Sequence, residues 1–566
     1  MNVLRLLLFI MSITSAVSVR GSCPHYASPV NYDIVLAGNF GEPRPNHFHG
    51  GVDIKTGGVE GKPIFSVGDG YVSRISIGLY GFGNAVYVHH PDGYTSVYCH
   101  LKKFTPQITA LLRRKQYACR RAEGEFEFRP AEMPVTQGQL IAVSGNTGAS
   151  TAPHLHLEIH DNRTWNMLDP LDFIGDQMHD SVPPMAHAFM VYPVEGEGVF
   201  NGSTQKQSYG FSSHHLSQLF KAWGRVGFGL WANDYMQASY NHYGIRQTEL
   251  FVDGRLVFSS DVSNIPLEHN MQVNAWGDYD HFLRAHVWYM KSFLEPGVTL
   301  PIISAGNERG IVNFNEERDY HFCYQLTDYK GNQSRYEFVV KGVKESIFLS
   351  GRNDGKMKSG KYFLRFDRFN DVQLPGAQLA LRPYTLPNDL FLSPTVTSQP
   401  EAYSDAYQFM PQSFQLFRYV PIALRVHNNK VADTSKLYIV SHWGRDQYMG
   451  GEYREGYVYG KARELGATYE LAYDDQPPVA QYLGLVRGSR GHVLRVSLDD
   501  GQSGISNYEA FLDGQFVLFE PVPKTSILEC YLEDSPVRPK GKLRTLRFLA
   551  TDNRQNQVEM SVQVLF

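Results

Sequence analysis

Short alternating segments of apolar and polar residues, broken by glycine and proline, fill the chain from about residue 28 to residue 172. A period of two places successive side chains on opposite faces of an extended strand. The triplet Pro91-Asp92-Gly93 separates two such segments, residues 85–88 and 95–98, as in a β-hairpin. The first third of the chain is therefore expected to consist of short strands joined by tight turns.

An internal repeat organises the second half of the chain. A pattern of Gly-Ile, Glu, Phe and Asp-Gly begins at Gly244 and recurs at Gly504, an offset of 260 residues. In each copy the Asp-Gly pair joins two apolar runs, which predicts a hairpin with a tight turn. A second match, Thr-Asp followed by Asn-Gln, closes the copies at residues 327–333 and 551–557. Two similar all-β modules of immunoglobulin-like sandwich type are therefore expected.

These patterns predict a mainly β protein with five segments. They are a signal peptide at residues 1–19, an N-terminal domain at 20–180, an immunoglobulin-like module at 181–344, a β-rich module at 345–473 and a second immunoglobulin-like module at 474–566. The middle module is inferred from strand-like runs separated by long polar loops.

The N-terminus indicates export. Arg5 precedes an apolar run at residues 6–19, which is too short to span a bilayer but fits the core of a signal peptide. An uncleaved anchor helix is the less favoured interpretation. Arg20 stands where a lipid-anchor motif before Cys23 would need an aliphatic residue, so a lipid anchor is also disfavoured. We expect an exported protein of the periplasm or cell envelope, or a secreted one, that is not integral to a membrane.

The amino-acid composition favours β-strands and does not support a nucleic-acid partner. Aromatic residues make up 13% of the chain and there are 51 glycines, which favours strands and turns. Lys and Arg total 53 against 57 for Asp and Glu, so no basic excess points to a nucleic acid. Five cysteines form no disulfide framework. Cys99 and Cys119 could pair, but small buried hydrophobic side chains are at least as good an interpretation.

Two histidine motifs carry the candidate chemistry. In the segment at residues 154–159, alternation places His154, His156 and Glu158 on one face of a strand and the leucines and isoleucine on the other. His49 and Asp53 flank two glycines, which let the backbone approach closely. A catalytic zinc takes three protein ligands and leaves one position open, and His49, Asp53 and His156 would supply those three. His154 and His100 would then assist proton transfer and stabilise the oxyanion.

Each motif alone is weak. A lone His-x-His on a strand is more often surface or core filler, and His47, His89, His90 and His160 are interpreted in that way. For Glu158 the preferred interpretation is a carboxylate that supports a ligand or faces solvent.

In this order, however, the motifs closely resemble the lysostaphin-type (LytM-like) zinc metallopeptidases of the peptidase M23 family, which cleave peptidoglycan. The resemblance covers roughly residues 37–172. Its matching stretches are residues 49–54, 61–64, 81–86, 98–101, 144–148 and 154–159. The resemblance implies an antiparallel β-sheet groove with one zinc per chain at its floor.

The resemblance also assigns roles. It implies that His49, Asp53 and His156 hold the zinc and that His154 and His100 act in catalysis, with the general base unassigned between them. An insertion at about residues 104–134 departs from the family pattern, as do Cys99 and Leu157. Within the insertion, Ile108, Leu111 and Leu112 share one face of a predicted helix and the segment could form part of the groove wall.

The leading hypothesis is a zinc endopeptidase that hydrolyses peptide stems or cross-links of peptidoglycan. The alternative of a different class is a non-catalytic wall-binding or hydrolase-activating scaffold on the same fold. A third interpretation makes the β modules a glycan-binding array, with Tyr235, Tyr240 and Tyr243 as candidate stacking residues, although aromatics of this kind usually pack inside sandwiches. A regulatory protein partner could also bind the β modules.

Overall fold

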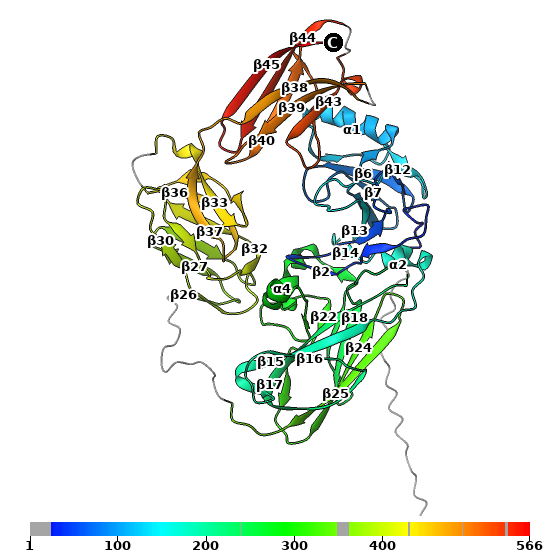
Figure 1. The fold of residues 1–566 in the computed structure, drawn as a ribbon, viewed down its shortest axis with the longest axis vertical. Helices are drawn as coiled ribbons and strands as arrows, with labels where there is room; N and C mark the ends of the chain where they lie inside the picture. Colours follow the sequence, from blue (N-terminus) through cyan, green and yellow to red (C-terminus); the bar gives the residue numbers. More distant parts are fainter. Residues whose placement is uncertain (1–23, 238, 348–361, 428–430, 489–490, 538–540) are drawn as a thin grey trace, which may run out of the picture.

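The computed structural model describes residues 24–237, 239–347, 362–427, 431–488, 491–537 and 541–566. The predicted signal peptide and Cys23 lie outside these residues. The successive parts of the chain follow one another around a ring, so that the last module returns to the N-terminal domain (Figure 1).

The N-terminal domain is built on an antiparallel sheet in the order β1-β4-β13-β8-β7-β6-β10. These strands are β1 (Leu36–Gly38), β4 (Val52–Lys55), β13 (His154–Asp161), β8 (Tyr94–Cys99), β7 (Ala85–His89), β6 (Gly70–Ile77) and β10 (Gly124–Glu127). A second, three-stranded sheet holds β5 (Pro63–Phe65), β12 (Leu140–Val143) and β9 (Lys103–Phe104). The hairpin predicted around Pro91-Asp92-Gly93 is the connection between β7 and β8.

The apolar residues of β13 form the core face of the strand, as their alternation with polar residues predicted. Leu155, Leu157 and Ile159 are fully buried in the core. The chain at Gly51, just before β4, passes very close to β13. A Cβ on Gly51 would lie only 2.2 Å from the Leu157 carbonyl oxygen. The glycine pair before β4 is therefore required by packing, as the sequence suggested.

The first module differs from a simple two-sheet sandwich, because its strands join into one ten-stranded sheet. The main path is β16 (Gln207–Gly210), β15 (Met185–Phe200), β17 (His215–Asn233), β25 (Gln333–Gly342), β24 (Asp319–Thr327), β18 (Gln247–Val252), β19 (Arg255–Asp261) and β22 (Ile303–Ser304). The 19-residue strand β17 also pairs with β21 (Met290–Lys291) and β23 (Val312–Phe314). Register shifts between β15 and β17 bend this sheet around an aromatic core in which Phe189 stacks on Phe338.

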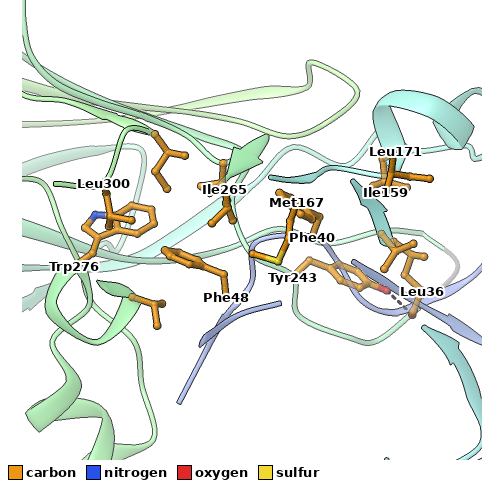
Figure 2. Packing of buried hydrophobic residues seen from close by; sticks show 14 of the residues in the cluster. Leu36, Phe40, Phe48, Ile159, Met167, Leu171, Tyr243, Ile265, Trp276 and Leu300 are labelled. Atoms are coloured by element: carbon orange, nitrogen blue, oxygen red, sulfur yellow. Dashed lines mark hydrogen bonds between the residues drawn. The ribbon is translucent and has the colours of Figure 1, made fainter. Parts of the chain in front are cut away.

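The N-terminal domain and the first module share one continuous hydrophobic core. Figure 2 shows Phe40, Phe48 and Met167 of the first beside Tyr243, Ile265 and Trp276 of the second. Pairing crosses the boundary as well, since β14 (Met167–Leu168) pairs with β20 (Asn264–Ile265). The short helices α2 (Leu171–Ile174) and α4 (Tyr279–Ala285) lie near this boundary (Figure 1), and α3 (Val273–Trp276) adds Val273, Ala275 and Trp276 to the shared core. The two parts therefore form one packed unit.

The middle module consists of two five-stranded sheets. One contains β27 (Asn370–Leu374), β28 (Ala377–Leu381), β32 (Gln415–Arg425), β36 (Tyr457–Glu464) and β35 (Glu452–Arg454). The other contains β30 (Thr395–Thr397), β31 (Ala406–Gln408), β37 (Thr468–Tyr473), β33 (Leu437–Trp443) and β34 (Arg445–Tyr448). A short pair of strands, β26 (Tyr362–Leu364) and β29 (Leu390–Leu392), completes it.

The last module is the expected sandwich of two four-stranded sheets. They are β38 (Val479–Gly488), β39 (Gly491–Asp499), β43 (Ile527–Tyr531) and β42 (Glu520–Pro521), and β41 (Gln515–Phe516), β40 (Ile505–Leu512), β44 (Leu543–Asp552) and β45 (Gln557–Leu565). Both repeated Asp-Gly turns are hairpin turns: Asp253 and Gly254 have φ of 50° and 73°, and Asp513 and Gly514 have 49° and 79°. Positive φ at both positions is what a tight hairpin turn requires.

The last module closes the ring on the insertion of the N-terminal domain. The predicted helix is present as α1 (Pro106–Cys119), with Ile108, Leu111 and Leu112 buried. Arg113 of α1 forms an ion pair of 2.5 Å with Glu520, and Tyr508 bonds to Glu123 at 3.1 Å. The insertion therefore serves as a docking surface for the last module.

Two further expectations can be compared with the fold. Cys99, Cys119, Cys323 and Cys530 are all free thiols, so Cys99 and Cys119 are not paired. Among the residues described, no helix is long and apolar enough to cross a membrane.

Candidate metal and catalytic site

Three adjacent strands bring the candidate ligands together. In the register of the main sheet, Asp53 of β4 lies opposite His156 of β13, and His156 lies opposite Cys99 of β8. His49 comes from the loop just before β4, where Gly50 and Gly51 allow the chain to pass against β13. Residues separated by more than 100 positions thus meet at one point of the sheet.

The three predicted ligands form a compact group. His49 Nε2 lies 3.0 Å from Asp53 Oδ1 and 3.0 Å from His156 Nδ1, and His156 Nδ1 lies 2.8 Å from Asp53 Oδ1. One atom of each residue falls within 4.8 Å of the others, and all three residues are buried. Two imidazole nitrogens and one carboxylate oxygen at this spacing suit a zinc ion with an open position.

The far side of each ligand is held by a hydrogen bond. His49 Nδ1 donates to the Asn39 carbonyl at 2.6 Å, which leaves Nε2 free to coordinate. His156 Nε2 lies 3.0 Å from Glu158 Oε1, and Arg44 donates to Asp53 Oδ2 at 2.7 Å. Bonds of this kind fix ring orientation and tautomer in metal sites, so the donor set fits a bound metal.

His154 and His100 lie beside the ligand group. His154 Nδ1 donates to the Ala152 carbonyl at 2.8 Å, and its Nε2 lies 3.3 Å from Asp53 Oδ1. His100 Nδ1 donates to the Thr147 carbonyl at 2.8 Å. The two rings are 4.8 Å apart between centroids, and His100 is 5.8 Å from His156. Both histidines therefore keep Nε2 available on the side of the ligand group.

The pKa values of the histidines and of Asp53 are shifted in different directions by their surroundings. Burial lowers the pKa of His100 to about 3, with help from the neighbouring His156 and His154, so its ring is neutral near pH 7. Burial also lowers the pKa of His49 to about 4. Although burial acts in the opposite direction, the charge on His49 and the hydrogen bonds from the histidines hold the pKa of Asp53 far below its usual range. Burial would lower the pKa of His156, but its hydrogen bonds to Asp53 and Glu158 and the charges of these carboxylates raise it to about 9. His49 therefore offers a neutral imidazole and Asp53 an ionised carboxylate, whereas His156 would give up a proton when a metal binds.

Sequence reasoning missed two residues and undervalued a third. Arg44 fixes Asp53 and lines a cavity of about 590 Å³ between the N-terminal domain and the first module, but no spacing in the sequence marks it. Asn39 contributes only its carbonyl, which carries no sequence signal. His160, interpreted as background, lies 2.6 Å from Glu158 Oε2 and stacks on Trp165. The alternation that places Glu158 on this face of β13 also places His160 there, so the sequence did contain this information.

The other background histidines have ordinary structural roles. His90 is buried and bonds to the Asp69 carbonyl and the Ser96 hydroxyl. His47 bonds to the Pro45 carbonyl. Tyr243, a candidate glycan-stacking residue, is buried in the shared core.

Comparisons with known proteins agree with the motif. Residues 47–116 match the model of Peptidase family M23, and residues 361–474 match that of a Zu5-like domain. An uncharacterized metalloprotease of Haemophilus influenzae is 34% identical over 114 residues, 20% of this chain and 19% of that protein. The peptidoglycan DD-endopeptidase ShyC of Vibrio cholerae is 34% identical over 107 residues, 18% of this chain and 19% of that protein.

Among solved structures, the catalytic domain of lysostaphin from Staphylococcus simulans matches with 26% identity and a TM-score of 0.19, covering 24% of this chain and 90% of that one. The chain spans about a fifth of the length of the curated relatives it matches. The matched segment holds His49, Asp53 and His100, and the geometry adds His154 and His156. The N-terminal domain of this chain resembles a LytM-like domain of peptidase family M23, as its family match over residues 47–116 and its curated relatives indicate.

Proposed function

We propose that the chain is a zinc metalloendopeptidase that hydrolyses peptide stems or cross-links of peptidoglycan in the cell envelope. The observation that carries the proposal is the convergence of His49 Nε2, Asp53 Oδ1 and His156 Nδ1 within 4.8 Å. The names of relatives such as ShyC favour a DD-endopeptidase activity. The proposal includes one zinc per chain and export across the inner membrane.

The bound zinc would polarise the scissile carbonyl and lower the pKa of an attacking water. His49, Asp53 and His156 would hold it, and Arg44 and Glu158 would keep Asp53 and His156 in place. These five side chains come from β13 and from the segment that runs through β2 (Pro43–Arg44) and β3 (His47–Phe48) to β4, so short segments of regular structure fix their relative positions.

His100 and His154 would handle the protons. Because each Nδ1 donates to a backbone carbonyl, each Nε2 is the atom that takes or gives a proton on the side of the ligands. In one assignment, His100 accepts a proton from the attacking water at Nε2 and His154 stabilises the oxyanion or protonates the leaving amine. The opposite assignment uses the same two atoms.

The alternative is a non-catalytic wall-binding or hydrolase-activating protein on this fold. The intact set of ligands and of two further histidines favours the enzyme. The β modules are proposed to position the catalytic domain at the wall or to bind a regulatory protein.

The test is cleavage of purified peptidoglycan by the chain from residue 24 onward, with fragments identified by mass spectrometry and zinc quantified. His156→Ala should lose both zinc and activity, by about 10³-fold or more for the latter. His47→Ala, which changes a histidine of the same stretch outside the ligand group, should keep both. Folded wild type that binds no zinc would favour the scaffold, whereas zinc-loaded protein that cleaves nothing would contradict the proposed substrate.

A further inference from the structure

Outside the peptidase site, three buried aspartates meet where the first module begins. They are Asp180, in the link after the N-terminal domain, Asp234, just after β17, and Asp328, in the turn between β24 and β25. One carboxylate oxygen of each lies within 4.8 Å of the others, and their residues are 7%, 1% and 3% exposed. Three carboxylates this close together and buried away from water repel one another strongly unless a cation binds between them.

Two of these carboxylates have an oxygen with nothing to bond. Asp180 Oδ2 and Asp234 Oδ1 are buried and have no hydrogen-bond partner. Asp328, by contrast, is used by its own turn, since Oδ1 accepts from the Lys330 and Asn332 amides. A buried, unpaired carboxylate oxygen is costly, so these two oxygens need a ligand.

Lysine and arginine side chains of the described residues do not neutralise these three carboxylates. In the described part of the chain, no lysine or arginine forms an ion pair with any of the three aspartates. Lys330 lies closest in sequence, but its ammonium donates to the Gly175 carbonyl at 2.8 Å. Burial and the charges of Asp328 and Asp180 raise the pKa of Asp234 to about 8, and burial also raises the pKa of Asp180.

The arrangement recurs in the last module. Asp474, Asp500 and Asp552 form the same kind of group, again at the start of the module. Asp180 and Asp474 both open an Asp-x-x-Pro-Pro sequence, and Asp328 and Asp552 occupy the matching Thr-Asp position of the repeat. In this second group every carboxylate has a protein donor: Ser503 and Gln476 donate to Asp474, Gly504 to Asp500, and Asn556 to Asp552. Among the described residues, only the first group therefore leaves buried carboxylate oxygens without a partner, Asp180 Oδ2 and Asp234 Oδ1.

We infer that Asp180, Asp234 and Asp328 form a calcium site that fixes the junction between the N-terminal domain and the first module. The ligand atoms are all oxygens, which selects a hard divalent cation. Three carboxylates that converge directly on one ion from separate segments suit Ca²⁺, which tolerates flexible geometry, better than Mg²⁺, which demands octahedral geometry and retains waters. Because Asp180 belongs to the link and the other two to the module, the bound ion joins both parts.

The experiment uses the chain from residue 24 onward, stripped of calcium, with zinc held constant in every sample. Titration calorimetry with CaCl₂ should show one Ca²⁺ per chain bound at this group, and millimolar CaCl₂ should raise the thermal midpoint by a few degrees. Asp234→Asn keeps the shape but removes one charge, so it should lose the calcium response. In the absence of calcium it should be at least as stable as wild type, because the like-charge repulsion is reduced.

Asp500→Asn, the corresponding change in the last module, is the matched control and should keep the calcium response. Asp180→Asn is a second variant and should behave as Asp234→Asn does. The inference is overturned if calcium does not shift the wild-type midpoint, if Asp234→Asn and Asp180→Asn respond as wild type does, or if MgCl₂ at the same concentration acts as strongly. None of these readouts depends on peptidase activity, so the result is independent of the proposed function.

Discussion

Lys524 Nζ donates a hydrogen bond of 2.8 Å to the carbonyl oxygen of Ser150, a residue 374 positions earlier in the chain. Ser150 belongs to the short loop that precedes His154, and its hydroxyl lies 3.3 Å from His154 Nδ1. The tip of the last module therefore touches the loop that orients one of the two proposed proton-transfer histidines.

We expect Lys524→Ala to lower kcat several-fold without changing zinc content, because the loop that holds His154 loses an anchor while the metal ligands are untouched. Steady-state kinetics on a soluble peptidoglycan fragment would measure this. Lys542→Ala, an exposed change in the same module, should have no effect. A loss of zinc in Lys524→Ala would show that the contact acts through the ligand group instead.

Arg113→Ala should open the ring. Its guanidinium pairs with Glu520 at 2.5 Å in a partly buried contact, so removing it costs about 1–2 kcal/mol, below the ~3–5 kcal/mol of a fully buried pair. We expect a larger radius of gyration by small-angle X-ray scattering and faster hydrogen exchange in α1. Arg547→Ala removes an exposed pair with Glu559 and serves as the control. A scattering curve equal to that of wild type would mean that other contacts suffice to hold the ring.

Glu158→Gln should weaken zinc binding by about 10–100-fold, because Glu158 joins His156 and His160 and fixes the orientation of the His156 ring. Competition with a chromophoric chelator would give the affinity. Glu127→Gln, at an exposed position of β10, is the control. If zinc affinity were unchanged while activity fell, Glu158 would act on the reaction and not on the ligand.

A fragment that ends at residue 180 should be much less stable than one that ends at residue 347. The cut at 180 exposes Phe40, Phe48 and Met167, which are buried against the first module, and each large apolar side chain contributes about 1.5–3 kcal/mol. Thermal unfolding of the two fragments, each with zinc, would compare them. Equal midpoints would mean that the shared core adds little to the N-terminal domain.

Local patterns predicted which side chains lie together. Alternation at residues 154–159 placed His154, His156 and Glu158 together, and the glycine pair anticipated the close passage of β4 against β13. The repeated Asp-Gly motif predicted both hairpins, and the helical spacing of Ile108, Leu111 and Leu112 predicted α1. These features depend on neighbours in sequence, so the sequence contains them.

Long-range contacts were beyond the sequence patterns. Arg44 meets Asp53 through the β2–β3 hairpin that precedes β4, and Asn39 acts through a backbone carbonyl that any residue would supply. The single bent sheet of the first module depends on the length and pairing of β17, which no local period reveals. The docking of α1 on the last module joins residues about 400 positions apart.

The contact between α1 and the last module makes the ring sensitive to the ionic strength of the solution. Because the last module belongs to the same chain as the domain it touches, the contact forms within one molecule and does not depend on protein concentration. The contact is made by charged and polar side chains at a partly exposed surface, so ionic strength or a competing polyanion acts on it directly. We therefore expect this contact to weaken as ionic strength rises.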